Sequence, residues 1–217
     1  MSMPFAQAVR DFRLDQQRGP LVSHRGEEVE EHPLELYFSE FAAEGDDGSW
    51  FESWLDGPLL DLEAGAGRHT LYFQQQFETV AVDQSELLVE TMRDRFRSVL
   101  VFGTQMSLAR SIHGVRQFLS YLAFVTAPDA TAVVDGFDPE HEQTTEMIDY
   151  YADPARGLAY RVLQFEYDGT LGEPWLYRLF TPDRIRDATV GTDWDVVDVN
   201  PGAGDWAHHY KLALKKG

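Results

Sequence analysis

The sequence predicts a doubly wound α/β fold, with a mostly parallel sheet, helices on both faces and an antiparallel C-terminal edge. Short apolar runs typical of buried strands alternate with helix-period segments between Leu59 and Phe137. The first of these runs ends on an acid and leads through a glycine turn, Asp61 to Gly67, into a helix. Beyond residue 157, strand patterns follow one another across glycine turns, which is typical of antiparallel pairing.

Residues 1–56 are predicted to form an N-terminal extension, or lid, that packs on a main domain at 57–217. Its helix is indicated by apolar residues at helical spacing, and Gly19-Pro20 breaks that pattern. The predicted elements of the extension are a helix over 5–12, strand-like residues at 21–31, an apolar-periodic segment at 34–41 and a turn at 45–48.

The main domain begins with a predicted βαβ unit and ends with antiparallel strands. Pro128 is expected to end its longest helix, and Thr181 to cap a later helix with Pro182 just inside it. The first elements are a strand at 59–62, a helix at 68–77, a strand at 79–83, a helix at 86–95, a strand at 98–102, a helix through 108–122 and a strand at 130–137. An acidic stretch at 138–153, paired strands at 158–167 and 175–180, a helix from 181 and strands at 195–199 and 210–214 complete it.

The chain is strongly acidic and has no cysteine. Eighteen Lys and Arg against 37 Asp and Glu give 18 − 37 = −19 over 217 residues. Because such a charge repels phosphate backbones and anionic lipid, neither nucleic acid nor a membrane is the expected partner. The absence of cysteine excludes disulfides, thiolate metal sites and cysteine nucleophiles. No apolar run is long enough to span a bilayer and no secretion signal is evident, so the expected location is the cytoplasm.

The spread of acidic residues over the whole chain favours a halophilic, haloarchaeal source. At very high salt, screening acts over a few ångströms, so self-repulsion costs little while carboxylates keep the surface hydrated. The alternative is an ordinary acidic cytosolic protein.

The most informative residues are Asp61, Gly65, Gly67 and Asp83. Glycines in a strand-to-helix turn let the main chain approach a ligand where a Cβ would collide. Asp83 ends the next strand about 20 residues later, in the position of an acid that accepts hydrogen bonds from a ribose diol. Together these residues predict a nucleoside-containing cofactor.

The composition of the turn favours a cationic cofactor over a dinucleotide. A dinucleotide fingerprint has a third glycine where this chain has Thr70, and the carboxylates of Asp61 and Glu63 would face a pyrophosphate. S-adenosylmethionine carries a positive sulfonium and amine and has no phosphate, so it suits the site better. A nicotinamide-dependent oxidoreductase is a remaining alternative, which tight NADH binding would favour.

At these residues the sequence resembles the class I S-adenosylmethionine-dependent methyltransferases, specifically their small-molecule group. That group's loop usually reads Asp-Leu-Gly-Cys-Gly-x-Gly-Arg-His, and residues 61–69 here read Asp-Leu-Glu-Ala-Gly-Ala-Gly-Arg-His. The likeness extends over about three quarters of the chain, through 83–85, 99–108, 130–139 and 194–215. It implies a Rossmann-like methyltransferase sheet, S-adenosylmethionine as cofactor, S-adenosylhomocysteine as product and a small-molecule acceptor of unknown identity.

The resemblance also implies roles for individual residues. The turn would surround the methionine moiety, Asp83 would bind the ribose hydroxyls, Gln84 would lie beside the adenine, and the loop after the central strand would line the cofactor. The predicted cofactor-binding residues are Asp61, Glu63, Ala64, Gly65, Gly67, Arg68, Asp83, Gln84, Phe102, Gly103 and Gln105. Four aromatic residues are candidates to line the acceptor pocket, with core or lid packing as the alternative: Tyr37, Tyr150, Tyr151 and Trp175.

The chain departs from the family pattern in two places. Glu63 replaces the first glycine, and its carboxylate either hydrogen-bonds the methionine amine or crowds the site. The connection from Asp83 to Ser98 is shorter than the family's by about 20 to 25 residues, which reflects a deletion or a disordered segment absent from this sequence. Losing a strand there would leave 79–82 as an exposed sheet edge. If these departures prevent turnover, the protein is a cofactor-binding or regulatory protein of the same fold.

Other polar residues are more simply explained by packing or solvation. His69 is expected to pack rather than to catalyse, and His208-His209 and the acidic run 138–142 lack the helical i, i+4 spacing of a metal pair. An arginine among 110, 116, 161 and 178 would suit an acidic substrate, although a surface ion pair is the commoner role. No catalytic base is assigned.

Overall fold

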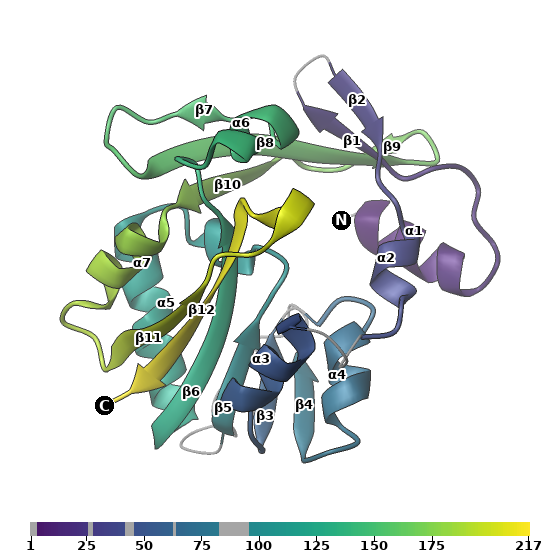
Figure 1. Ribbon diagram of the computed structural model, residues 1–217. Coiled ribbons are helices and arrows are strands. Elements are labelled where there is room, and N and C mark those ends of the chain that lie inside the picture. The colour runs from purple at the N-terminus through teal and green to yellow at the C-terminus, as the bar shows by residue number, and fades with distance from the viewer. Residues whose placement is uncertain (1–3, 26–27, 42–45, 63, 83–95) are drawn as a thin grey trace.

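The computed structural model of this chain describes residues 4–25, 28–41, 46–62, 64–82 and 96–217 (Figure 1). Its N-terminal elements are α1 (Pro4–Arg13), β1 (Val22–Arg25), β2 (Glu28–Glu31), α2 (Glu35–Phe38) and α3 (Asp46–Trp54). The central elements are β3 (Leu59–Leu62), α4 (Arg68–Phe73), β4 (Thr79–Val82), β5 (Phe96–Val101), the 3-10 helix η2 (Gln105–Ala109), α5 (Ile112–Val125) and β6 (Thr126–Phe137). The last are α6 (Glu142–Met147), β7 (Tyr151–Ala152), β8 (Leu158–Tyr167), β9 (Thr170–Leu171), β10 (Trp175–Phe180), α7 (Pro182–Thr189), β11 (Trp194–Asn200), η3 (Gly204–Trp206) and β12 (His209–Lys216).

One sheet has the mixed α/β organisation that the sequence predicts. Its strand order is β11-β12-β6-β5-β3-β4, in which β4, β3, β5 and β6 are mutually parallel. The C-terminal strands β12 and β11 add to it antiparallel. The expected parallel sheet with an antiparallel C-terminal edge is confirmed. All carboxyl ends of the parallel strands therefore meet at one edge of this sheet.

Helices cover both faces of this sheet (Figure 1). On one face, α5 and α7 pack on β5, β6 and β12 through Leu119, Leu122 and Ile185. On the other, α3 and α4 contribute Phe51 and Phe73 to a cluster with inner residues of β3, β5 and β6. Burial of apolar side chains on both faces stabilises the parallel strands, which are apolar for that reason.

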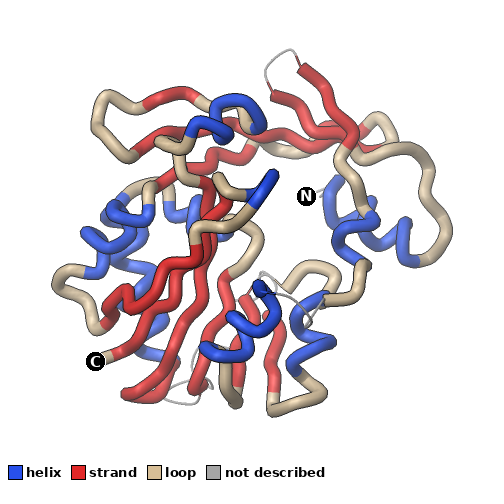
Figure 2. Tube along the Cα trace, viewed as in Figure 1, coloured by secondary structure: helices blue, strands red, loops and turns tan. Residues whose placement is uncertain are grey.

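A second, antiparallel sheet lies across the carboxyl edge of the first (Figure 2). Its order is β10-β8-β1-β2, and β7 and β9 pair with β8. The sequence predicts the pairing of 158–167 with 175–180, which is confirmed, but not the addition of β1 to β8. The N-terminal strands β1 and β2 and the strands between residues 151 and 180 thus build one layer, and α1 packs against it through Ala8.

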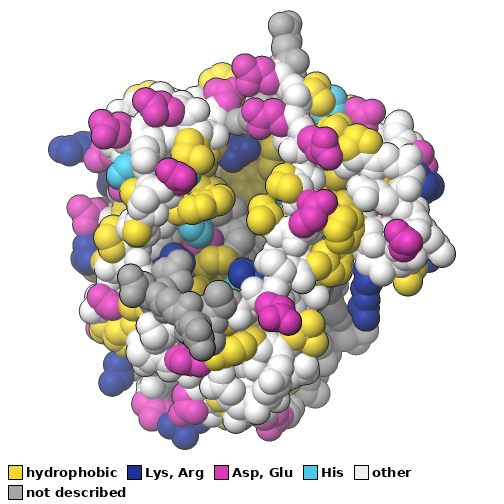
Figure 3. Space-filling model, turned by 45° about the vertical axis from the view of Figure 1, so that its right-hand side comes forward, with side chains coloured by type: hydrophobic (Ala, Val, Ile, Leu, Met, Phe, Trp, Pro, Cys, Tyr) yellow, Lys and Arg dark blue, Asp and Glu magenta, His cyan; other side chains and the backbone are white. Residues whose placement is uncertain are grey.

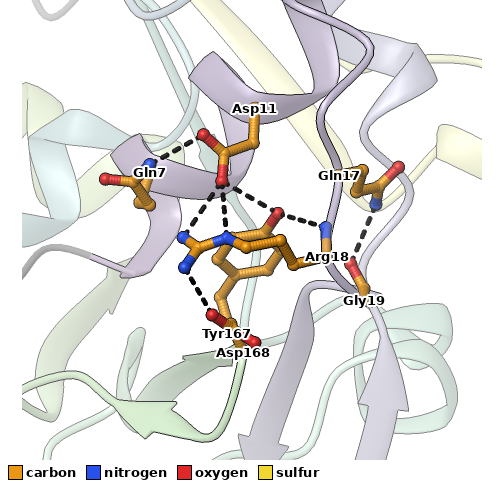
Figure 4. Close-up of polar contacts among 7 residues, drawn as sticks. All are labelled: Gln7, Asp11, Gln17, Arg18, Gly19, Tyr167 and Asp168. Carbon is orange, nitrogen blue, oxygen red and sulfur yellow. Dashed lines mark hydrogen bonds and ion pairs between the residues drawn. The ribbon is translucent and has the colours of Figure 1, made fainter.

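A polar cluster joins the N-terminal segment to this second sheet (Figure 4). Arg18 Nε donates to the Asp11 carboxylate at 3.1 Å, and the Tyr167 hydroxyl donates to it at 3.2 Å. Arg18 also pairs with Asp168 at 2.5 Å. Desolvation raises the pKa of Asp11, but hydrogen bonds from Gln7, Arg18 and Tyr167 outweigh it and leave that pKa below its ordinary value. The cluster therefore stabilises the position of α1 over β8.

Two local expectations are wrong. Residues 46–48 belong to α3, which begins at Asp46, and not to the turn that the sequence predicts at 45–48. The burial of Phe51 and Leu55 overrides the weak helix propensity of the first turn of α3.

Pro128 does not end the long helix. That helix ends at Val125, and Pro128 lies within β6, between Thr126 and Thr131, where the register with β5 shifts.

The strand β4 is the last in the described strand order. The expected helix at 86–95 and the candidate residues Asp83, Gln84 and Glu63 lie outside the described residues. Within the described ranges, no helix is long and apolar enough to cross a membrane.

Candidate functional site

The glycine turn follows β3 at the carboxyl edge of the parallel strands. Gly65 and Gly67 have φ of 57° and 81°, the left-handed conformation that favours glycine. The Gly67 amide donates to the Ala64 carbonyl at 2.8 Å, and the Ala64 amide donates to Val82 of β4 at 3.4 Å. Among the atoms of the described residues, an added Cβ on Gly67 would meet none nearer than Leu71 Cγ at 3.9 Å. The described residues therefore leave space for a ligand beside Gly67.

Asp61 is the buried acid of the turn. Its residue is 3% exposed, and it accepts a hydrogen bond from the Thr70 hydroxyl of α4. Burial raises the pKa of Asp61 to about 6, and hydrogen bonds from Thr70 act in the opposite direction. Thr70 stands where a dinucleotide fingerprint has its third glycine, and here it fixes the first turn of α4 to β3. Its side-chain role was not predicted from the sequence.

Arg68 joins the turn to the N-terminal segment. Its guanidinium donates to the carbonyls of Ser39 and Glu40 at 3.1 and 3.2 Å and lies 5.6 Å from the centre of the Phe41 ring. The contacts of the described residues therefore give Arg68 a role in positioning residues 39–41 beside the glycine turn.

The loop after the central strand β5 is held by a residue that sequence reasoning missed. Asp135 of β6 accepts the Gly103 amide at 3.2 Å and the Thr104 amide at 2.8 Å. Gly103 has φ of 89°, and within the described ranges an added Cβ there would meet Gln105 Nε2 at 3.8 Å and no other atom within 4 Å. Phe102, Gly103 and Gln105 follow β5 and are thus at the same edge of the sheet as the glycine turn.

Two histidines lie near Asp135. The Nε2 atom of His209, the first residue of β12, is 2.7 Å from Asp135 Oδ2. His69 of α4 packs against the rings of Phe51 and Phe102, with centroids 5.8 and 4.9 Å away. Burial lowers the pKa of His69 to about 4, with Arg68 adding to this and Asp135 opposing it. His69 is therefore a neutral packing residue in this structure, in agreement with its expected role.

Asp135 carries a sequence signal that was available. It ends the apolar run Ala132-Val133-Val134, as Asp61 and Asp83 end earlier strands. An acid at the carboxyl end of a buried parallel strand indicates the ligand-binding edge of such a sheet.

The four acceptor candidates do not form one group. Tyr37 and Trp175 join the apolar cluster under the second sheet, and the Tyr37 hydroxyl is 2.7 Å from His32 Nε2. Burial raises the pKa of Tyr37 to about 12. Tyr150 donates to the Pro139 carbonyl at 2.9 Å, and Tyr151 is largely exposed and stacks on Tyr160. Of the four candidates, Tyr37 and Trp175 share this cluster, and Tyr150 and Tyr151 do not belong to it.

The molecule is hollowed between the second sheet and the carboxyl edge of the first (Figure 3). Hydrophobic side chains line much of this hollow, and at least one histidine and basic side chains are visible in its wall. A separate hollow of about 490 Å³ lies at the amino ends of β5 and β6, between Trp54, Phe77, Arg97 and Thr131. Because open α/β sheets bind ligands at their carboxyl ends, this second hollow is not the candidate cofactor site.

The described residues contain no group of three or more side chains suited to hold a metal ion. Of the arginines considered, Arg178 pairs with Asp153 and Arg116 donates to the Asp187 carbonyl at 3.1 Å. Arg161 lies opposite Tyr177 in the pairing of β8 with β10.

The sequence matches no family model and no curated protein. In three dimensions the chain shares the fold of solved S-adenosylmethionine-dependent methyltransferases. One, from Bacteroides fragilis and in complex with S-adenosyl-L-homocysteine, is 17% identical, with a TM-score of 0.76 over 98% of this chain and 94% of that chain. Another, from Methanosarcina mazei, is 10% identical, with a TM-score of 0.56 over 77% of this chain and 96% of that chain. A third, from Clostridium acetobutylicum, is 13% identical, with a TM-score of 0.52 over 73% of this chain and 83% of that chain.

Proposed function

We propose that this protein transfers a methyl group from S-adenosylmethionine to a small-molecule acceptor. The observation that carries the proposal is the open glycine turn beside the buried carboxyl of Asp61, at the carboxyl edge of the parallel strands. A carboxylate at this position suits the cationic amine of S-adenosylmethionine better than it suits a pyrophosphate. The fold shared with solved methyltransferases supports the same cofactor.

The residues that would hold the cofactor surround this edge. Asp61, Ala64, Gly65 and Gly67 would contact the methionine moiety, and Phe102 and Gly103 would form the opposite wall. Glu63, Gln105 and Gln84 are proposed to contribute as the sequence predicts. The sulfonium supplies an activated methyl group, so positioning of the acceptor in line with it contributes much of the rate. The hollow beneath the second sheet is the proposed acceptor pocket, enclosed in part by residues 1–56.

Calorimetric titration with S-adenosylmethionine and S-adenosylhomocysteine tests the proposal, with NADH as control. We expect both adenosyl ligands to bind and NADH not to bind. Binding without transfer to any acceptor would favour the cofactor-binding or regulatory alternative. Absence of binding by folded protein would contradict the cofactor assignment, and tight NADH binding would favour an oxidoreductase.

Asp83→Ala is expected to weaken cofactor binding by about 1.5–3 kcal/mol, because it removes a charge-assisted hydrogen bond to the ribose. Asp83 follows β4, whose last residue, Val82, pairs with Leu62 just before the glycine turn. The matched control is Asp56→Ala, since Asp56 is exposed and pairs with Arg97 at the opposite edge of the sheet. Equal affinities of the two variants by calorimetry would remove the ribose assignment.

Affinity for S-adenosylmethionine is expected to fall about tenfold between pH 8 and pH 5. Burial raises the pKa of Asp61 to about 6, so the carboxylate that attracts the cofactor's amine becomes protonated over this interval. The ionised form binds better, and affinity is therefore lost as the pH falls. In Asp61→Asn we expect low affinity with little change over the same interval, and an unchanged pH dependence would assign the effect to another group.

The charge of −19 supports a halophilic origin, and this origin is part of the proposal together with the expected cytoplasmic location. The temperature of unfolding is expected to rise steeply with KCl concentration because salt screens the repulsion among carboxylates. Scanning calorimetry over a KCl series measures this. A temperature of unfolding independent of KCl would indicate an ordinary acidic protein.

A further inference from the structure

A buried carboxylate–imidazole pair lies at the carboxyl edge of the doubly wound sheet. Asp135, near the end of β6, has no exposed side-chain surface, and 13% of the His209 side chain is exposed. His209 Nε2 and Asp135 Oδ2 are 2.7 Å apart. The two residues come from neighbouring antiparallel strands, so the sheet itself fixes their separation.

The contacts of Asp135 define the orientation of the imidazole. The carboxylate accepts hydrogen bonds from the main-chain N–H groups of Gly103 and Thr104. A carboxylate can only accept hydrogen bonds. The hydrogen between the two side chains therefore lies on His209 Nε2, and His209 Nδ1 carries a lone pair. Among the described residues, no hydrogen bond to His209 Nδ1 is found. Phe102 and Phe137 lie beside the ring, with centroids 5.8 and 5.0 Å away, and restrict its rotation.

We propose that His209 is the general base that removes a proton from the methyl acceptor, with Asp135 as its positioning residue. This inference rests on the proposed function. The same carboxylate that orients His209 holds Gly103, which is proposed to form a wall of the cofactor site. The base and the wall of the cofactor site are therefore both held by Asp135, and no described residue occupies His209 Nδ1 with a hydrogen bond.

The chemistry implies an acceptor with a proton on its nucleophilic atom, a hydroxyl or an amine. His209 Nδ1 takes that proton while an electron pair of the oxygen or nitrogen forms a bond to the methyl carbon. The bond between methyl carbon and sulfur breaks, and its electron pair stays on sulfur as the neutral thioether of S-adenosylhomocysteine. Asp135 stabilises the imidazolium that results, which then releases its proton to water.

Other titratable groups surround the pair. Lys211 lies opposite Asp135 in the pairing of β12 with β6. His208 stacks on Phe137, and burial, followed by His209 and His141, lowers the pKa of His208. Tyr210 donates to the Phe180 carbonyl at 2.7 Å, and burial raises its pKa, with Asp135 and Asp138 acting in the same direction. His69 is held neutral by burial. None of these groups is hydrogen-bonded to His209 Nδ1 in the described part of the chain.

His209→Gln tests the inference, because a glutamine amide can donate to Asp135 but cannot take up a proton. With a panel of small phenols, alcohols and amines as acceptors, S-adenosylhomocysteine release is expected to fall by about 100-fold or more in kcat. The acidic limb of the kcat profile, produced in the wild type by protonation of the imidazole, should disappear. Calorimetric affinity for S-adenosylhomocysteine should stay within about twofold. The matched control is His113→Gln, which changes an exposed histidine of α5 and should behave as wild type.

A second measurement does not depend on the variant's fold or on the acceptor. Long-range ¹H–¹⁵N spectra of the histidine rings of the wild-type protein should show His209 with hydrogen on Nε2. Hydrogen on Nδ1, or a kcat and pH profile in His209→Gln equal to those of the wild type, would overturn the inference. Wild-type protein that binds no S-adenosylhomocysteine would instead remove the proposed function itself.

Discussion

Gly67→Val is expected to reduce affinity for S-adenosylhomocysteine by at least about 100-fold, beyond the range of calorimetric detection. Gly67 has φ of 81° and stands just before α4, and the nearest described atom to an added Cβ would be Leu71 Cγ at 3.9 Å. A β-branched side chain there would occupy the space proposed for the methionine moiety. It would also strain the backbone by roughly 1–2 kcal/mol, because L-residues rarely adopt this conformation.

The effect of backbone strain is separated from ligand exclusion by Gly191→Val. Gly191 has φ of 83°, and an added Cβ there would meet no atom of the described part of the chain within 4 Å. It lies between α7 and β11, so the variant carries similar strain away from the glycine turn. Both variants should show similar losses in the temperature of unfolding, but only Gly67→Val should lose S-adenosylhomocysteine binding. Normal binding by Gly67→Val would mean that the turn does not approach the ligand.

The parallel sheet could be predicted because each of its strands carries a local signal. Leu59–Leu62 and Thr79–Val82 are short, mostly apolar runs bounded by polar or glycine residues, a pattern typical of parallel strands. The expected burial is confirmed for β3 but not for β4, which is only partly buried because it is last in the described strand order. Thr181 and Pro182 likewise mark the start of α7 through cap chemistry, with the Thr181 side chain accepting from the Arg184 amide.

The second sheet could not be predicted, because its assembly depends on contacts distant in sequence. Val22 of β1 pairs with Glu166 of β8, and nothing local to either strand specifies its partner. The helix α3 was missed for a related reason. Its residues favour a turn locally, and the helix is stabilised by packing of Phe51 against the first sheet.

The sequence could predict the part of the candidate site that one short segment of the chain supplies. It could not predict the part that depends on residues from several segments. Asp61, Gly65 and Gly67 are close in sequence, so their pattern alone indicates a ligand-binding turn. The pairing of Asp135 with His209 joins residues 74 positions apart, through the antiparallel addition of β12 to β6. The sequence shows an acid and a histidine, but only the strand register places their side chains together.

Trp194→Ala is expected to cost about 3–5 kcal/mol of unfolding free energy, the largest loss from a single substitution considered for this chain. Trp194 begins β11, is 1% exposed and packs among residues of α5, α7 and β12. Its indole Nε1 donates to the Leu119 carbonyl at 3.0 Å. Truncation would leave a cavity between the sheet and both helices of this face, where close packing prevents full collapse.

A loss of this size is a large part of the roughly 5–15 kcal/mol that stabilises a typical domain, and it corresponds to a fall of roughly 6–20 °C in the temperature of unfolding. The matched control is Trp206→Ala, because Trp206 is 56% exposed and its removal should cost less than about 1 kcal/mol. Scanning calorimetry of both variants at one KCl concentration makes the comparison. Equal losses of unfolding free energy in the two variants would mean that Trp194 of β11 does not pack between the sheet and the helices α5 and α7. The antiparallel C-terminal edge of the sheet would then need to be reassigned.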